Sequence, residues 1–131
     1  MNFTSEDIKD MLVDDSSLGL TFATDLFISK EPAGIDDTVT IYDMMGLPPD
    51  STNDRSVKYY RPSIQIRIKN NSYQVGMALA YDIMDSLHNR AQEEWNGTLY
   101  TVIQAMGEPA LSHWDENDRA IIFINFNCQR R

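Results

Sequence analysis

The sequence predicts one α+β domain over residues 1–131, with a mostly antiparallel sheet of four to five strands packed against helices on one face. Three observations support this prediction. A length of 131 residues is common for one domain. The composition, with 42% hydrophobic and 24% charged residues, is typical of folded proteins. Several segments alternate like strands, and one long segment has helical periodicity.

The first predicted element is a short helix at about residues 5–14. Thr4 is expected to cap its amino end, and Asp7 lies at the third helical position, where an acidic side chain favours the helix start. Phe3 and Ile8 have the spacing of a hydrophobic staple.

Three strands are expected next. Leu20–Ser29 and Thr38–Asp43 alternate between apolar and polar residues, and Tyr60–Lys69 does so most clearly. The residues between the last two strands, Met44–Lys58, are too many for a simple turn, so we expect a long loop there.

The main helix is expected at about residues 72–89. Asn71 and Gln74 resemble a capping box, and apolar residues then recur at helical spacing: Tyr73, Met77, Ala80, Met84 and Leu87. Two further strands, Leu99–Met106 and Ala120–Cys128, are expected to pair antiparallel. The second begins with apolar residues on both faces, which predicts a central position.

Charge is distributed unevenly along the chain. The net charge is −9, which opposes non-specific binding to DNA or to anionic lipid. Residues 1–54 hold twelve acids and two bases, hence −10, whereas residues 55–131 hold eight acids and nine bases, hence +1. Five bases stand together without an acid among them: Arg55, Lys58, Arg61, Arg67 and Lys69.

The sequence contains none of the common motifs for catalysis or phosphate binding. It has no phosphate-binding loop, nucleophile elbow or metalloprotease motif. Cys128 is the only cysteine, and His88 and His113 are the only histidines, so a zinc site would lack its usual ligands. We therefore expect no enzyme activity, catalytic residue, cofactor or metal site. The polar amino terminus and the absence of a long apolar run predict no membrane association.

Several motifs, in this order, resemble bacteriophage minor capsid and tail terminator proteins. The first is the run from Val39 to Asp50, with its Gly-Leu-Pro-Pro segment. It is followed by Arg-Pro-Ser-Ile-Gln-Ile-Arg-Ile at residues 61–68, Asp-Ser-Leu-His at 85–88 and Gly-Glu-Pro at 107–109. The sequence departs from the family at Met44 and Met45, where smaller residues are common.

The resemblance implies a tail-terminator-like fold and a role in assembly. Such proteins form a six-membered ring on the tail tube, stop its growth and offer a surface for head attachment. We therefore expect a homo-hexamer, which could remain monomeric until the tail tube templates it. The expected partners are the tail tube protein and a head completion or connector protein. The expected location is the head-proximal end of the virion tail, after assembly in the host cytoplasm.

A ring requires that one patch of each subunit meets a different patch of the next. We expect the five clustered bases to face acids of the neighbouring chain, with apolar residues supplying most of the stability. The residues predicted for this subunit interface are Arg55, Lys58, Tyr59, Arg61, Arg67, Lys69, Asp36, Asp37, Tyr42, Asp43, Met44, Met45 and Leu47. The residues predicted to contact tail or head partners are Pro48, Pro49, Asp50, Pro109, Leu111, His113 and Trp114.

Genomic DNA is expected to pass through the ring without specific binding, because six copies at −9 would carry −54. Two other protein classes remain open. A head completion or connector protein of the phage neck would share the ring geometry. An acidic DNA mimic that inhibits a nucleic-acid enzyme would also be negatively charged, although here a basic segment interrupts the acids.

Overall fold

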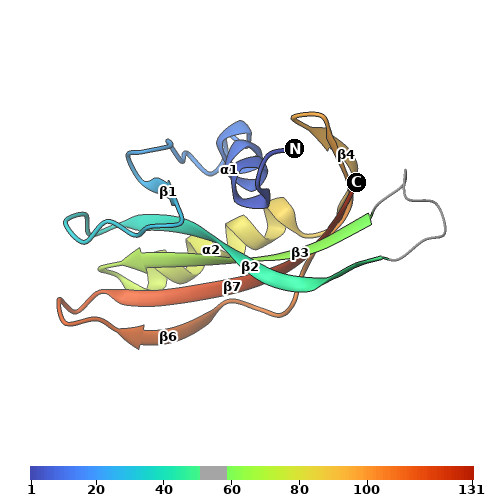
Figure 1. Cartoon of the computed structure of the whole chain (residues 1–131). Coiled ribbons are helices and arrows are strands. Elements are labelled where there is room, and N and C mark those ends of the chain that lie inside the picture. The colour runs from blue at the N-terminus through green and yellow to red at the C-terminus, as the bar shows by residue number, and fades with distance from the viewer. Residues whose placement is uncertain (51–58) are drawn as a thin grey trace.

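The computed structural model describes residues 1–50 and 59–131. Two helices, α1 (Thr4–Asp14) and α2 (Tyr73–Leu87), pack on the same face of a curled sheet (Figure 1). The described strands of this sheet are β1 (Leu26–Ile28), β2 (Thr38–Asp50), β3 (Tyr59–Asn70), β4 (Arg90–Trp95), β5 (Thr98–Ala105), β6 (Ala110–Trp114) and β7 (Ala120–Arg130). The predicted α+β class is thus confirmed.

The strand order is β1-β2-β3-β7-β5-β4, and β6 also pairs with β7. Seven strands in the described residues exceed the predicted four to five, because the polar β4 and the short β6 lack a clear apolar alternation. The named strand pairs are antiparallel except β1 and β2, which run parallel, so the sheet is mixed. The expected antiparallel pairing of β5 with β7 and the central position of β7 are confirmed.

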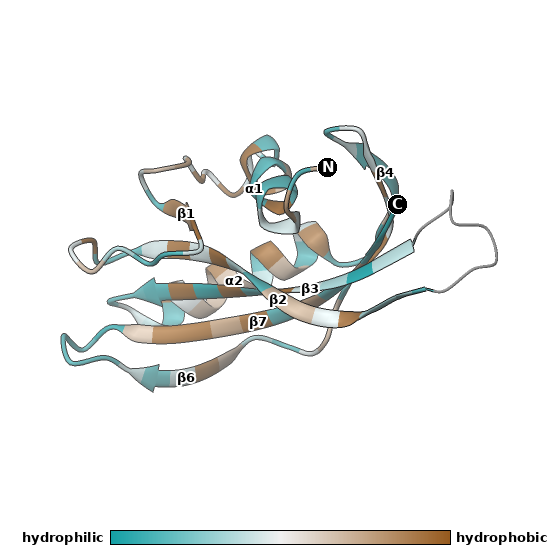
Figure 2. Cartoon of the chain, viewed as in Figure 1, coloured by the Kyte–Doolittle hydropathy of each residue, from teal (hydrophilic) through white to brown (hydrophobic). Residues whose placement is uncertain are grey.

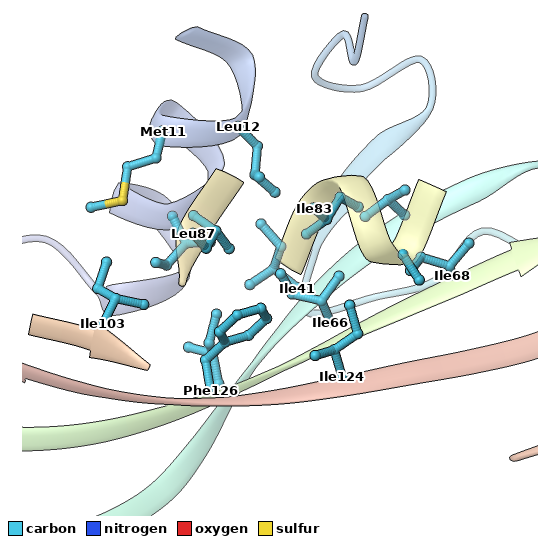
Figure 3. Close-up of a cluster of buried hydrophobic side chains, with 14 of the residues drawn as sticks. Met11, Leu12, Ile41, Ile66, Ile68, Ile83, Leu87, Ile103, Ile124 and Phe126 are labelled. Atoms are coloured by element: carbon cyan, nitrogen blue, oxygen red, sulfur yellow. The ribbon is translucent and has the colours of Figure 1, made fainter. Parts of the chain in front are cut away.

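The hydrophobic core lies between the helices and the concave side of the sheet. Ile64, Ile66 and Ile68 alternate along β3 toward this side, and all three are buried. They meet side chains from both helices and from β2 and β7, including Met11, Leu87, Ile41, Ile124 and Phe126 (Figure 3). This face of the sheet is therefore covered within the chain, and both described helices lie on it, so that neither covers the opposite face.

The amino end of α1 differs from the prediction. The residue before the helix is Phe3, and no side chain of that position caps it, so Thr4 is not the cap. Instead, Ser5 donates its backbone N–H and its hydroxyl to the carboxylate of Asp43 in β2. The cap comes from 38 residues further along the chain, which is why local sequence patterns did not indicate it.

The cap and the buried face of the main helix, α2, also differ from the prediction. Ser72 caps α2 by accepting a hydrogen bond from the N–H of Val75, in place of the predicted Asn71. The fully buried stripe is Gly76, Ala80, Ile83 and Leu87, one position away from much of the predicted stripe. A Cβ at Gly76 would lie 2.8 Å from the side chain of Ile122, so the glycine permits close packing of α2 on β7.

The predicted strand Leu20–Ser29 shrinks to β1, three residues long. Asp25 accepts a hydrogen bond from the N–H of Thr21, and the carbonyl of Thr21 accepts three N–H groups of the following turn. Ala23 consequently has a φ of 67°. The alternation was genuine, but an aspartate that bonds its own backbone favoured a turn over an extended strand.

Candidate assembly surface

Residues 44–50, the first part of the segment predicted as a long loop, continue strand β2 instead, and the rest of that segment, residues 51–58, lies outside the described residues. We define the arm as residues 44–50 of β2 and 59–63 of β3, which pair at Met44 with Ser63, Leu47 with Arg61 and Asp50 with Tyr59. β2 extends through Asp50 despite Pro48 and Pro49 because β1 pairs only with Val39–Ile41, which leaves the arm as an edge. The arm projects beyond the helices (Figure 1).

Gly46 makes the irregular pairing of the arm possible. The register shifts between Met44 and Leu47, and Gly46 adopts a φ of 68° inside this bulge. A Cβ there would lie only 2.4 Å from the carbonyl oxygen of Arg61. The glycine therefore sets both the bend of β2 and its contact with β3.

An ion pair ties the two strands of the arm together. The guanidinium of Arg61 donates two hydrogen bonds of 2.9 Å to the carboxylate of Asp50. These bonds lower the pKa of Asp50 below its usual 3.8. Because Arg61 is already paired within its own chain, its charge is partly neutralised at the arm surface.

Apolar side chains gather on the outer surface of the arm. Met45 is 98% exposed, Leu47 59% and Met44 47%. Together with Gly46, Ser63, Ile64, Met106, Asn125 and Asn127 they line a pocket of about 320 Å³. We call this pocket the methionine pocket. Exposed methionines around a concavity are typical of surfaces that bind other protein segments.

The floor beside the methionine pocket is polar but uncharged. Ser63 bonds Asn127 across β3 and β7, and Gln65 bonds Asn125 in the same way. An adjoining cavity of about 160 Å³ continues past Leu47 and Arg61 to Gln104 and Gln129. Figure 2 shows that β7 is apolar beside β6 and more hydrophilic toward the arm. Few charged residues line this surface, as is typical of the core of protein interfaces.

The structure separates the predicted basic cluster. Arg55 and Lys58 lie outside the described residues. Lys69 is 2% exposed, and its ammonium group donates to the carbonyl of Pro32 at 2.6 Å. Arg67 lies on the outer face with its guanidinium 5.9 Å from the ring centre of Tyr42. Of the described bases in the cluster, Arg67 is thus the one with neither a carboxylate nor a carbonyl partner among the described contacts.

Of the remaining residues predicted for the interface, some bond within their own chain and others stay exposed. Tyr59 accepts a hydrogen bond from Arg131 at the far end of the arm, where Tyr59 pairs with Asp50. The carboxylate of Asp43 is occupied by Ser5, and that of Asp37 accepts the N–H of Asn71. The side chain of Asp36 remains 65% exposed, 3.5 Å from Arg119. Asp36 is therefore the acid of this group best placed to meet a neighbour.

A hairpin tip at residues 115–118 connects β6 and β7. The carboxylate of Asp115 accepts N–H groups of Asn117 and Arg119, and Arg119 also donates its side chain to Asp115. Every residue of β6 is exposed, including Leu111, His113 and Trp114. Pro109 is buried, whereas Pro48 and Pro49 are exposed on the arm.

The sequence did not indicate which residues outside the arm line the methionine pocket with it. Met106 directly follows β5 and was predicted only as the last residue of a strand, yet it is 60% exposed beside the arm. Asn125 and Asn127 are the polar residues that alternate with Phe126 late in β7, and this alternation is the signal in the sequence that could have indicated a polar outer face. Within residues 1–50 and 59–131, no group of three or more His, Cys, Asp or Glu side chains could hold a metal ion. No described helix is long and apolar enough to cross a membrane.

Solved structures share this fold at low sequence identity. One is a chain from a structure described as the virion of a native gene transfer agent particle, with a TM-score of 0.69 and 13% identity. That match covers 97% of this chain and 93% of the other. A second structure has a TM-score of 0.56 and 12% identity, covering 98% and 97%. At these identities the likeness shows the fold alone. No curated protein matches the sequence.

The fold is thus also found in a chain from the virion of a gene transfer agent particle. A family model narrows this class: the model described as bacteriophage tail terminator protein matches residues 12–131. The chain therefore belongs to the bacteriophage tail terminator family, whose members are structural proteins of the virion tail. The family resemblance expected from the motifs at residues 39–50 and 61–68 is confirmed.

Proposed function

We propose that this chain forms a closed six-membered ring on the head-proximal end of the tail tube, ends tube growth and provides the surface to which the head attaches. The observation that carries the proposal is the β-hairpin arm, which projects from the domain and exposes Met44, Met45 and Leu47. An exposed apolar arm with a pocket beneath it favours a contact between subunits over an isolated monomer.

The contact between subunits is heterologous, since a ring joins two different patches of the same chain. The arm supplies one patch, with Tyr42 and Tyr59 adding aromatic area to its methionines. Arg67 is the described base of the cluster that remains available, and Asp36 of the next subunit is the matching acid. Arg61, Lys69 and Asp43 act within their own chain and support the arm, the outer loop and α1.

Contacts along the axis of the tail involve the ends of the domain. Pro48, Pro49 and Asp50 lie at the far end of β2, and His113 lies near the β6–β7 hairpin tip. These exposed segments are suited to contact the tail tube protein on one side and a head completion or connector protein on the other. Rigid prolines at an edge also block unwanted pairing of β2 with other strands.

Genomic DNA passes through the ring without specific binding in this proposal. The net charge of −9 per copy supports it, as do the occupied bases. Arg90, Arg119 and Arg130 each donate to carboxylate or carbonyl groups of their own chain. DNA phosphates would therefore meet few free cations among the bases of residues 1–50 and 59–131.

Negative-stain electron microscopy of the purified chain tests the proposal. We expect closed rings of one diameter, and we expect the triple variant Met44→Ser, Met45→Ser, Leu47→Ser to give single subunits. The matched control is Val13→Ser with Phe22→Ser, which removes exposed apolar side chains of the α1 region. Rings that persist in the triple variant would rule out the arm as the subunit contact.

A further inference from the structure

A second exposed apolar patch lies on β6, on the opposite face of the sheet from the methionine pocket. Leu111 pairs with Ile122 and Trp114 pairs with Ala120 in the register of β6 with β7. Directly paired residues of antiparallel strands share a face, and Ile122 and Ala120 are buried on the helix side. Leu111 and Trp114 therefore lie on the helix side, at a sheet edge, and Trp114 is 49% exposed.

The methionine pocket lies on the other face and at the other end of the sheet. Met44 pairs with Ser63, which pairs with Asn127, and these positions alternate with the buried Ile64 and Phe126. Figure 1 places the arm and the β6–β7 hairpin at opposite ends of the domain. Two apolar patches that face opposite ways allow a head-to-tail contact from copy to copy.

The chemistry of the two patches is complementary. The pocket of about 320 Å³ has methionine walls, and thioether sulfur packs favourably at the edges of aromatic rings. Tryptophan buries roughly 150–250 Å² and is enriched among the residues that dominate interfaces. The polar pocket floor, with Asn125 and Asn127, also offers acceptors for an indole N–H.

Charges beside the two patches also match. Glu116 and Asp118 are exposed at the hairpin tip just beyond Trp114. Arg67 lies on the outer face two residues along β3 from Gln65, which bonds Asn125 at the pocket. An incoming hairpin tip would bring its acids toward this guanidinium, and that attraction would fix its orientation.

We propose that the β6 edge of one copy, with Trp114 as its anchor, seats in the methionine pocket of the next copy. This inference rests on the proposed ring and names its second patch. It places Leu111 and Trp114 between subunits, whereas the sequence alone assigned them to tail or head partners. The occupant of the pocket is thus a second copy of this chain.

Disulfide trapping tests the pairing. Met45→Cys and Trp114→Cys are combined in one chain in which Cys128, which is buried, is replaced by alanine. Both new positions are exposed, so folding is expected to be retained. Mild oxidation should give a ladder of cross-linked species up to the closed ring on a denaturing gel. The matched control pairs Met45→Cys with Val13→Cys, which is similarly exposed, and should give no ladder.

The outcomes separate this pairing from the ring itself. A ladder supports the pairing, even if the ring is weak in solution, because trapping captures transient contacts. No ladder from a variant whose native mass is still that of a ring overturns the pairing and leaves the ring. No ladder and no ring from the wild-type chain overturns both. As a second readout, Trp114→Ala should raise the concentration of half-assembly about tenfold or more, and Trp114→Phe should recover part of this loss.

Discussion

The carboxylate of Asp43 in β2 accepts two hydrogen bonds from Ser5 at the start of α1, one from its backbone N–H at 3.0 Å and one from its hydroxyl at 2.6 Å. A strand therefore supplies the cap of a helix that the helix's own sequence does not provide. The contact joins the first helix to β2 just before the arm begins at Met44. The position of α1 and the root of the arm are thus linked by one acid.

Replacing Asp43 with alanine should lower the free energy of unfolding by about 1–2 kcal/mol, the usual cost of losing a helix cap. Urea denaturation followed by circular dichroism measures the change. Asp14→Ala is the matched control, because it removes the same charge from the exposed carboxyl end of α1, where a negative charge is unfavourable. Equal stability of wild type and Asp43→Ala would show that the cap contributes nothing.

Alanine substitutions at Gly46 and Gly97 distinguish the cost of a strained backbone conformation from the cost of a steric clash. Both have positive φ, but a Cβ at Gly97 would meet no atom within 4 Å, whereas one at Gly46 would meet the backbone of Arg61. Gly97→Ala should lose about 1 kcal/mol of stability from the left-handed conformation alone. Gly46→Ala should lose distinctly more and should loosen the arm. Hydrogen exchange of the amides in residues 59–63 measures the second effect, and unchanged protection would contradict it.

Acid should weaken the ion pair of the arm. The pKa of Asp50 is lowered by its hydrogen bonds to Arg61, so the contribution of the pair is present above the unfolded value of 3.8 and is lost as pH falls through the lower folded value. An NMR titration of the Asp50 carboxyl carbon measures the folded pKa directly. In Arg61→Gln this pKa should rise toward 3.8. An identical titration in both proteins would mean that the pair does not form.

Cys128 should be inert in the folded protein. The thiol is buried, and burial raises its pKa to about 12, so the thiolate is scarce at neutral pH. Ellman's reagent should label it slowly in buffer and fully within minutes in denaturant. Fast labelling of the native chain would contradict the central, covered position of β7.

Reversing the charge of Arg67 should weaken the ring. Arg67→Glu replaces the described base beside the methionine pocket that remains free of a carboxylate, and it turns an attraction to Asp36 or the hairpin tip into a repulsion. Lys30→Glu is the control, because it changes the net charge equally at an exposed residue that does not line the pocket. The concentration of half-assembly, measured by light scattering, should rise for Arg67→Glu alone. Equal assembly of both variants would remove Arg67 from the contact.

The sequence predicted those elements whose partners are apolar and whose patterns are local. Ile64, Ile66 and Ile68 in β3, and the helix starting near Ser72, belong to this group. The arm was missed because Pro48 and Pro49 argue against a strand unless one edge is known to be free. β4 was missed because its polar residues Arg90–Trp95 form the outer strand of a hairpin and need no apolar alternation.

The candidate surface was predicted only in part for a similar reason. Met44, Met45 and Leu47 stood out as apolar residues in an expected loop, and the structure places them at one pocket. Local patterns could not predict whether each basic side chain is exposed or bonded within the chain, because this depends on residues distant in the sequence. Lys69 alternates with isoleucines as an exposed residue would, yet the loop at Pro32 covers it. Asp43 looked free and is taken by Ser5.

The most direct test of the central claim is the native mass of the purified chain over a range of protein concentrations, at low and at high salt. The account predicts a closed ring of six copies whose half-assembly concentration rises with salt, because charge orients an interface that apolar burial stabilises. A mass of one subunit at every concentration and salt would contradict the claim that this chain assembles its own ring through the arm.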